Sequence, residues 1–306
     1  MYKNDLVWRK VQDYLPPQNR LSIEIEPKEY FLKLNNGNRI HLDLYSPRTP
    51  KATIILFHGV GGNGRLLSFL AVPLFKNGYQ VICPDMPLYG YSEYKGAVNY
   101  DMWVTDAAEI AQHYTEEELP VFLFGLSAGG MLAYQAACQV PDVRGVLATC
   151  ILDQRLQIVR EKTASNPLLV RVGLPLTRQL RKAIPRFRIP MKWVANMKAI
   201  VNNQKLAKLL MADKKSSGAK ITLDFLYTML HPNIMVEPEN FTIPFALLHP
   251  DNDLWTPPSL SRLFYDRLKY EKEMHLLTGA GHFPIEEQGL NVLTEKAVTF
   301  IEKHRF

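Results

Sequence analysis

The sequence predicts an open, doubly wound α/β sheet that is interrupted by one large helical insertion. From about residue 50 onward, short apolar runs, of the kind buried on both faces of a sheet, alternate with helical stretches. Parallel strands need crossover connections, and helices supply them on both faces of the sheet. In addition, residues 154–240 separate two apolar runs by far more chain than a crossover needs, which indicates the insertion.

The strands follow in chain order. Residues 29–34 and 39–45 alternate polar and apolar side chains, and the Asn and Gly residues between them favour a hairpin turn. Buried strands are predicted at residues 53–57, 80–83, 121–124, 143–148, 245–248 and 273–277. Helices are predicted between them at residues 65–77, 100–114, 130–139, 259–268 and 286–303.

The insertion predicts two structural units. We expect a core made of residues 1–153 and 241–306, and a helical cap made of residues 154–240. Prolines are predicted to divide the first half of the cap into short pieces, at Pro167, Pro175, Pro185 and Pro190. Longer amphipathic helices are predicted in the second half, at residues 197–211 and 221–230.

The composition is that of a globular protein. A chain of 306 residues with 47% apolar content can fill a sizeable core. The first residues lack the apolar segment of a signal peptide and no stretch reaches the length of a membrane span, so we expect a soluble, cytoplasmic protein. The cysteines are widely spaced in apolar surroundings and are predicted to be buried small side chains: Cys83, Cys138 and Cys150.

The net charge of +6 is unevenly distributed along the chain. Residues 154–240 contain sixteen Lys or Arg against five Asp or Glu. A solvated helical face is the common cause of such a bias. Transient contact with an anionic membrane surface, or an acidic leaving group, also fits it. No recognised nucleic-acid-binding motif accompanies these residues, so we expect no nucleic-acid partner.

A Gly-x-Ser-x-Gly pattern lies between a predicted strand and a predicted helix. It runs from Gly125 to Gly129, with Ser127 at its centre. Glycines at both ends permit a turn that is sharp enough to strain the backbone of the serine and expose its hydroxyl. We therefore predict that Ser127 is a nucleophile, and the alternative is a serine in an ordinary strand-to-helix turn.

A serine nucleophile needs a base and an acid that orients the base. His282 is the predicted base, because it lies in a glycine-containing loop between the last predicted strand and the C-terminal helix. Asp253 is the predicted acid, in the loop after residues 245–248, which gives the chain order Ser, Asp, His. The alternative acids are Asp251 and Asp153.

A glycine-rich loop, residues 58–64, follows the strand predicted at residues 53–57. We predict that the backbone N–H groups of Val60 and Ala128 hold the oxyanion of an acyl-transfer reaction. The residues predicted to support this loop are His58, Gly59 and Gly61. Phosphate binding is the rival interpretation, but the loop lacks the Gly-Lys-Ser/Thr ending of a P-loop and the spacing of a dinucleotide-binding loop. No metal and no cofactor are predicted.

These segments together resemble the α/β-hydrolase superfamily, and most of all its lysophospholipase and monoacylglycerol lipase branch, from about Glu29 to the C-terminus. Residues 85–92 add to the resemblance, because they are similar to the family pattern Asp-x-x-Gly-x-Gly-x-Ser. Two positions depart from it. Leu88 replaces the first glycine of that pattern, and Leu126 stands before the serine where many of these lipases carry His.

The resemblance implies an α/β-hydrolase fold with an inserted cap, no cofactor, and a serine carboxylic-ester hydrolase that forms an acyl-enzyme on Ser127. The expected substrate is a lipid-like ester such as a monoacylglycerol or a lysophospholipid. Thioesterase, acyltransferase, carbon–carbon hydrolase and peroxidase-like chemistry, or a non-catalytic binding protein, stay open, and so does the oligomeric state. Apolar cap residues that can line an acyl pocket, or else pack the cap onto the core, are Leu168, Leu169, Leu174, Leu176, Trp193, Leu209, Leu210, Phe225, Leu226 and Tyr227.

Overall fold

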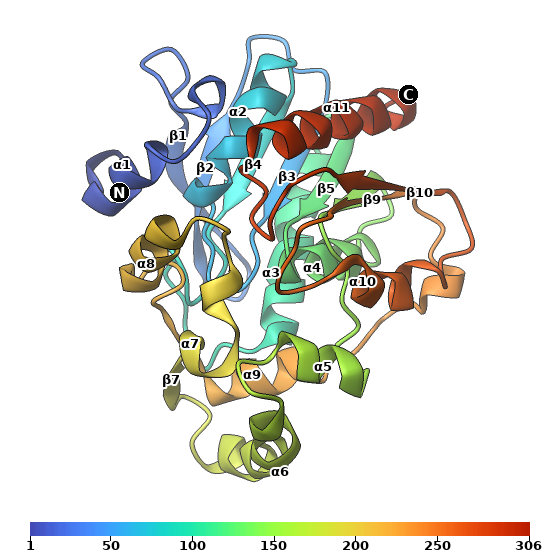
Figure 1. Cartoon of the computed structure of the whole chain (residues 1–306). Helices are drawn as coiled ribbons and strands as arrows, with labels where there is room; N and C mark the ends of the chain where they lie inside the picture. The colour runs from blue at the N-terminus through green and yellow to red at the C-terminus, as the bar shows by residue number, and fades with distance from the viewer.

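The computed structural model describes the backbone of residues 1–306 and all side chains except those of residues 168–170, 172 and 174. An eight-stranded sheet forms its centre, in the order β1-β2-β4-β3-β5-β6-β9-β10 (Figure 1). β2 pairs antiparallel with β1 and β4, and the remaining neighbours pair parallel. The predicted, mostly parallel α/β sheet is therefore confirmed.

The predicted strands are all present, and their ends differ from the prediction by at most two residues. They are β1 (Lys28–Lys33), β2 (Arg39–Tyr45), β3 (Thr53–Phe57), β4 (Gln80–Pro84), β5 (Val121–Gly125), β6 (Val143–Ala148), β9 (Phe245–Pro250) and β10 (Lys272–Leu277). β3, β4, β5 and β9 are buried along their whole length, which explains why they contain continuous apolar runs.

Helices cover both faces of the sheet. α11 contacts α2, β9 and β10 on one face, while α3 and α4 contact each other and β5 on the other (Figure 1). The bounds of the core helices, including the short α10, are α2 (Ser68–Lys76), α3 (Tyr100–Thr115), α4 (Ala128–Ala137), α10 (Pro258–Tyr265) and α11 (Glu287–His304). The 3-10 turn Arg65–Leu67 precedes α2, so the helix predicted at residues 65–77 begins irregularly.

The insertion between β6 and β9 gathers mainly at one end of the sheet (Figure 1). Its elements are α5 (Gln157–Thr163), α6 (Pro167–Ala183), β7 (Arg188–Pro190), α7 (Met191–Val194), α8 (Gln204–Ala212), β8 (Lys220–Thr222) and α9 (Leu223–Leu230). β7 and β8 form a small antiparallel pair. This end carries the loops that follow β5 and β9, so the insertion lies over the carboxyl ends of the parallel strands.

Two predictions inside the insertion are wrong. α6 continues through Pro175, because its contacts with α5 and α9 offset the hydrogen bond that a proline removes from a helix. The helix predicted at residues 197–211 is divided into the 3-10 turn Met197–Ala199 and α8. The side chain of Asn203 caps α8 by accepting hydrogen bonds from the N–H groups of Lys205 and Leu206, which sets the start of the helix.

The N-terminal segment, residues 1–27, packs beside the insertion. It contains the 3-10 turn Tyr2–Asn4, helix α1 (Leu6–Gln12) and the 3-10 turn Pro17–Asn19. α1 contacts α8, and Figure 1 shows both at the same side of the sheet. Among the described residues, we find no helix that combines the length and the apolar character needed to cross a bilayer.

Candidate active site

Ser127 occupies a strained turn between β5 and α4. Its backbone has φ +57° and ψ −128°, a conformation that residues other than glycine rarely adopt. Its N–H donates a hydrogen bond to Thr149 Oγ1 at 3.2 Å, at the end of β6. The turn leaves the side chain half-buried at the carboxyl edge of the sheet. This is the arrangement that the Gly-x-Ser-x-Gly pattern predicts.

The structure brings the three predicted residues Ser127, His282 and Asp253 together. The Nε2 atom of His282 lies 2.8 Å from the Oγ atom of Ser127. On the other side of the ring, Nδ1 lies 2.7 Å from Asp253 Oδ2. An ionised carboxylate can only accept, so Nδ1 carries a proton and the neutral ring presents Nε2 as an acceptor to the serine hydroxyl.

Asp253 is held by the turn that follows it. Its Oδ1 accepts hydrogen bonds from the N–H groups of Trp255 and Thr256, both at 2.8 Å. The hydroxyl of Thr256 donates to Oδ2 at 2.7 Å. Burial by itself would raise the pKa of Asp253, but the adjacent imidazole of His282 and these hydrogen bonds hold that pKa at about 2. The carboxylate therefore stays ionised at neutral pH.

The two alternative acids lie elsewhere. Asp251 is exposed, and its Oδ1 accepts a hydrogen bond from the N–H of Gly279 at 2.7 Å. Asp153 is buried and forms an ion pair with Arg155 at 2.8 Å. Asp253 is the carboxylate that contacts His282.

Thr256 and Trp255 are contacts that sequence reasoning missed. The hydroxyl of Thr256 lies 3.1 Å from His282 Nδ1 as well as beside Asp253. The ring of Trp255 packs against the imidazole with a centroid distance of 4.7 Å, and its Nε1 donates to the carbonyl of Thr163 in the insertion. The sequence signal is an Asp followed by residues whose N–H groups can turn back to it, as in other Asx turns.

The glycine-rich loop approaches the serine turn closely. A Cβ atom on Gly59 would lie 2.7 Å from the Cβ of Ser127 and 2.9 Å from the nitrogen of Ala128, so no other residue fits there. Val60, Ser127 and Ala128 line one cavity. Within the part of the chain that the structure describes, the N–H groups of Val60 and Ala128 donate to no protein group. Both are available to a ligand, and Ala128 is at the N-terminus of α4.

His58 connects this loop to the next one. Its Nδ1–H donates to the carbonyl of Gly59 at 2.7 Å, and its Nε2 accepts from the N–H of Met86 at 2.9 Å. Burial lowers the pKa of His58, so the ring stays neutral and serves both bonds. Gly61, with φ +81°, accepts a hydrogen bond at its carbonyl from Ser217 Oγ at 2.9 Å.

A cavity of about 300 Å³ lies beside Ser127. Its walls are mostly apolar, and the insertion contributes Ile189, Met191, Trp193, Leu226, Met229 and Leu230. A much smaller pocket, of about 30 Å³, also adjoins Ser127 and His282, and its lining includes Leu67, Ile200 and Phe283.

The cavity includes two of the apolar cap residues that the sequence suggested, Trp193 and Leu226. Among the others, Leu210 and Phe225 are buried, Leu209 and Tyr227 are half-buried, and Leu176 is exposed. Leu168, Leu169 and Leu174 lie outside the described side chains. Ile189 and Met229 were not expected at the cavity.

One further group of ligating atoms lies away from the serine. Atoms of Glu29, His41 and Asp43 lie within 4.8 Å of one another, a spacing that can hold a metal ion. Arg65 already occupies this place, because it donates to Asp43 at 2.5 and 2.9 Å and lies 3.4 Å from Glu29. The guanidinium pairs with both carboxylates, so the group is a buried ion-pair network.

Solved structures of known proteins share the fold. A monoacylglycerol lipase from Paleococcus ferrophilus is 24% identical, with a TM-score of 0.68, and the match covers 87% of this chain and 99% of that one. A soluble variant of monoglyceride lipase from Saccharomyces cerevisiae, in complex with a substrate analogue, is 17% identical, with a TM-score of 0.72 and coverage of 95% and 98%. At these identities the likeness concerns the fold alone.

Sequence comparison adds a partial relative and a family. The 30 kDa subunit of magnesium chelatase from Rhodobacter capsulatus is 30% identical over 102 residues. That match covers 33% of this chain and 35% of the relative, so it spans about a third of each. A family model described as serine aminopeptidase, S33, matches residues 48–289, which is most of the chain. The chain therefore belongs to this family of hydrolases, within the α/β-hydrolase superfamily that its motifs resemble.

Proposed function

We propose that this protein is a serine carboxylic-ester hydrolase that acts through an acyl-enzyme on Ser127. One observation carries the proposal: hydrogen bonds of 2.8 and 2.7 Å connect Ser127 to His282 and His282 to Asp253, and Ser127 lines an apolar cavity. A hydroxyl, an imidazole and a carboxylate in this order form a nucleophile with its base and orienting acid.

The proposed reaction has two halves. Nε2 of His282 takes the hydroxyl proton while Ser127 Oγ attacks the ester carbonyl, and Asp253 stabilises the imidazolium that results. The N–H groups of Val60 and Ala128 receive the oxyanion, and His282 then gives its proton to the leaving alcohol. In the second half, a water loses a proton to His282 and attacks the acyl-enzyme, and the carboxylic acid leaves as Ser127 regains its proton.

The cavity favours a lipid-like ester, such as a monoacylglycerol or a lysophospholipid. Apolar walls and a volume of about 300 Å³ suit an acyl chain. The family name refers to an aminopeptidase, whose substrates carry a charged amino terminus. Among the described residues that line the cavity, Arg160 is the charged one and none is acidic, so an ammonium group would have no counter-charge there. This supports an ester over a peptide.

We assign residues 154–240 the role of a cap over a core of residues 1–153 and 241–306. The cap supplies much of the cavity wall, and it also contacts the catalytic loop, because Ile200 accepts a hydrogen bond at its carbonyl from the N–H of Phe283 at 3.1 Å. Arg267 of the core holds the C-terminal end of the cap, because it forms ion pairs with Glu237 and Glu239 at 2.8 Å.

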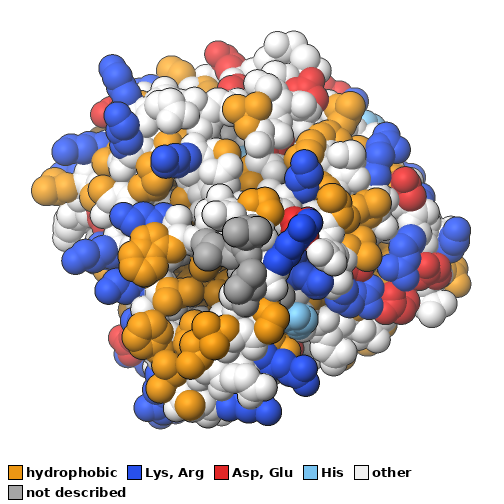
Figure 2. Space-filling model, turned by 60° about the horizontal axis from the view of Figure 1, so that its bottom comes forward, with side chains coloured by type: hydrophobic (Ala, Val, Ile, Leu, Met, Phe, Trp, Pro, Cys, Tyr) orange, Lys and Arg blue, Asp and Glu red, His pale blue; other side chains and the backbone are white. Residues whose placement is uncertain are grey.

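The cap also presents a surface that suits an anionic membrane. Large apolar side chains are exposed on α6 and on the chain that follows it: Leu176, Leu180, Ile184, Phe187 and Trp193. Exposed cations adjoin them: Arg178, Lys182, Arg186 and Lys192. Figure 2 shows apolar and basic side chains close together on the face that comes forward in this view. Trp193 also lines the cavity, so an ester leaving the membrane surface would enter beside it.

Labelling with a fluorophosphonate and hydrolysis of p-nitrophenyl esters and monoacylglycerols test the function. We expect the probe to modify the wild type once, at Ser127, and Ser127→Ala to lose both labelling and hydrolysis. Equal labelling of Ser127→Ala, or ester hydrolysis that survives this substitution, contradicts the proposal. Thiol esters and added alcohol acceptors in the same assay separate esterase activity from thioesterase and acyltransferase activity.

A further inference from the structure

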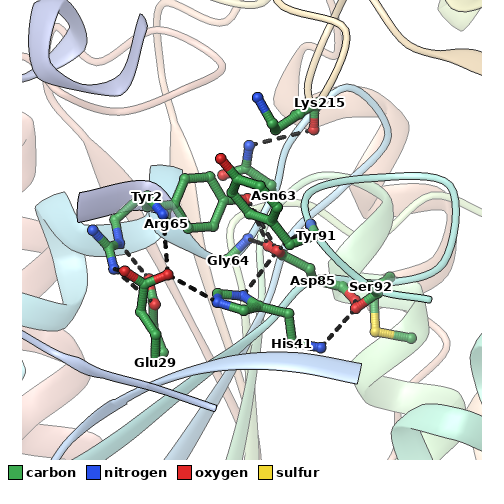
Figure 3. Close-up of polar contacts among 12 residues, drawn as sticks. Tyr2, Glu29, His41, Asn63, Gly64, Arg65, Asp85, Tyr91, Ser92 and Lys215 are labelled. Atoms are coloured by element: carbon green, nitrogen blue, oxygen red, sulfur yellow. Dashed lines mark hydrogen bonds and ion pairs between the residues drawn. The ribbon is translucent and has the colours of Figure 1, made fainter. Parts of the chain in front are cut away.

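The N-terminal segment reaches a buried network beside the oxyanion loop, residues 58–64 (Figure 3). The side chain of Tyr2 is only 2% exposed. Its hydroxyl donates to the carboxylate of Asp85 at 3.0 Å, and its backbone N–H donates to Glu29 at 3.0 Å. Residues 1–27 precede the region that the family model matches, so this connection begins outside that region.

Asp85 transmits the contact of Tyr2 to the oxyanion loop. Its carboxylate accepts hydrogen bonds from the N–H of Gly64 at 2.7 Å and from the N–H of Tyr91 at 2.8 Å. Gly64 ends the loop that carries Val60. The position of this carboxylate therefore fixes one end of the loop.

The fit around Asp85 is tight. Gly90 has φ +57°, and a Cβ atom there would lie 2.0 Å from the Asp85 carboxylate. His41 lies between two carboxylates, with Nδ1 3.0 Å from Asp85 and Nε2 3.1 Å from Glu29. Burial opposes the charged ring, but the carboxylates of Asp85 and Glu29 raise the pKa of His41 to about 9.

Carboxyl groups outnumber cations in this network. Among the side chains that the structure describes, those of Glu29, Asp43 and Asp85 share two cations, His41 and Arg65. A hydrogen-bond donor to a buried, under-compensated carboxylate contributes more than one at the surface. The hydroxyl of Tyr2 is such a donor, and its ring packs on His41 and Tyr91 with centroid distances of 5.4 and 4.8 Å.

Asp5 makes a second connection from the same segment. Its Oδ2 accepts from Lys215 Nζ at 3.0 Å. The backbone carbonyl of Lys215 accepts from the N–H of Gly90 at 2.9 Å and from the side-chain amide of Asn63 at 3.3 Å. Asn63 belongs to the oxyanion loop, and Figure 3 shows it beside Lys215. Lys215 belongs to the insertion, so the insertion contacts the oxyanion loop through a residue that Asp5 binds.

We propose that Tyr2 and Asp5 are positioning residues for the oxyanion loop, so that residues 1–5 serve as a clamp on the catalytic site. The inference rests on the proposed function, because it assigns the clamp to the loop that holds the oxyanion. Tyr2 acts through Asp85 and Asp5 acts through Lys215, and neither touches a reacting atom. The clamp keeps the N–H of Val60 aimed at the oxyanion, and such donors work only within a narrow range of distance.

The expected effect is smaller than that of deleting a donor. Removing one oxyanion donor lowers kcat by roughly 100-fold to 1,000-fold, so loosening one is expected to lower it about threefold to tenfold. Binding of the substrate in the ground state uses the apolar cavity, so KM stays within about twofold.

The test compares three variants in the same segment. Tyr2→Phe removes one hydroxyl from Asp85. Asp5→Asn keeps the cap of α1, because asparagine accepts the same N–H bonds, but it weakens the ion pair with Lys215. Tyr14→Phe is the matched control, since the hydroxyl of Tyr14 bonds to no group that the structure describes. The readouts are kcat per fluorophosphonate-titrated site, KM for a soluble ester, and inhibition by a trifluoromethyl ketone, whose adduct with Ser127 places an oxyanion in the loop.

We expect Tyr2→Phe and Asp5→Asn to lower kcat and to weaken inhibition by the ketone by the same factor, while KM stays unchanged. Tyr14→Phe should behave like the wild type. The proposal is overturned if kcat per titrated site stays at the wild-type value, or if only the fraction of titratable sites falls, which is the sign of a purely structural role. It is also overturned if KM rises while inhibition by the ketone is unchanged. A wild-type protein that neither labels nor hydrolyses esters would refute the proposed function itself, which is a separate result.

Discussion

Nε2 of His282 lies 2.8 Å from Oγ of Ser127, although 155 positions separate the two residues in the chain. Ser127 follows β5 and His282 follows β10, which lies three places away in the sheet. The loop after β10 must therefore cross back over β9 and β6. A hydrogen bond from the N–H of Gly281 to Glu286 at 3.0 Å holds this loop. A contact between distant residues is thus maintained by local bonds in the loop.

Asp253→Asn is expected to lower kcat by about 10³-fold to 10⁴-fold while KM changes little. An amide can donate its N–H to the imidazole, which favours the tautomer with a proton on Nε2 and removes the base from Ser127. The measurement is steady-state hydrolysis of a p-nitrophenyl ester, normalised to protein with native thermal stability. Asp251→Asn is the matched control, since Asp251 bonds to Gly279 instead. An equal loss in both variants would contradict the assignment of Asp253.

His41 is expected to make the folded state less stable as the pH rises from about 6.5 to about 9. Its pKa is about 9 in the folded protein and about 6.5 when unfolded, so the folded state binds the proton more tightly. This stabilisation is fully present below pH 6.5 and is lost as the pH passes through 9, and it amounts to roughly 3 kcal/mol. Arg65 pairs with two of the carboxylates around this ring, those of Glu29 and Asp43. The described charged and aromatic groups that face the ring itself are Glu29, Asp43, Asp85, Tyr2, Tyr91 and Phe31.

Urea unfolding at pH 6.5, 8 and 9.5 measures this loss. The wild type should lose more free energy of unfolding over this range than His41→Gln, which has no proton to release there. His113→Gln, on the exposed surface of α3, should behave as the wild type does. The same pH dependence in wild type and His41→Gln would show that another group is responsible.

The sequence predicted the sheet and the contact between Ser127 and His282 because both follow from local patterns. Continuous apolar runs specify buried parallel strands, and the carboxyl ends of such strands meet at one edge. A glycine-flanked serine and a loop histidine at that edge must then lie near each other. Thr256 was missed because its contribution depends on how the turn after Asp253 folds back, which no spacing rule describes.

The insertion was harder to predict because its helices depend on tertiary contacts. Pro175 would end an isolated helix, yet α6 continues through it. Tertiary contacts hold the helix beyond the proline, such as the ion pair between Arg181 and Asp224 of α9 at 3.0 Å. The contact between Tyr2 and Asp85 could not be predicted either, since 83 residues separate them and neither residue carries a pattern that points to the other. Long-range pairs of this kind emerge only from the packed structure.

Met229→Trp is expected to reduce the acyl-chain length that the enzyme accepts. Met229 is half-buried in the cavity wall on α9, and an indole there would fill space that an acyl chain needs. We expect kcat/KM for dodecanoyl esters to fall at least about tenfold, the effect of losing about two buried methylene groups, while acetyl esters are hydrolysed as before. Met235→Trp, on the exposed surface, is the control. A uniform loss for all chain lengths would place the acyl chain elsewhere.

Trp193 provides a direct probe of membrane contact. It is 62% exposed, whereas the other tryptophans of the chain are buried: Trp8, Trp103 and Trp255. If the cap docks on an anionic bilayer, vesicles that contain phosphatidylglycerol should shift the Trp193 emission to shorter wavelength, and brominated acyl chains should quench it. Vesicles of phosphatidylcholine alone should have little effect, because the basic side chains then have no partner charge.

The basic side chains of the cap should also contribute to binding of anionic vesicles. Lys192→Gln and Arg178→Gln should each weaken partitioning onto the anionic vesicles about fivefold, since each basic residue near such a surface contributes about 1 kcal/mol. High salt should have a similar effect on the wild type. Trp193→Phe should abolish the quenching that brominated lipids cause. The rate of hydrolysis of soluble esters should keep the same order of magnitude. Quenching that persists in Trp193→Phe, or binding that is insensitive to lipid charge, would place the membrane contact on another face of the protein.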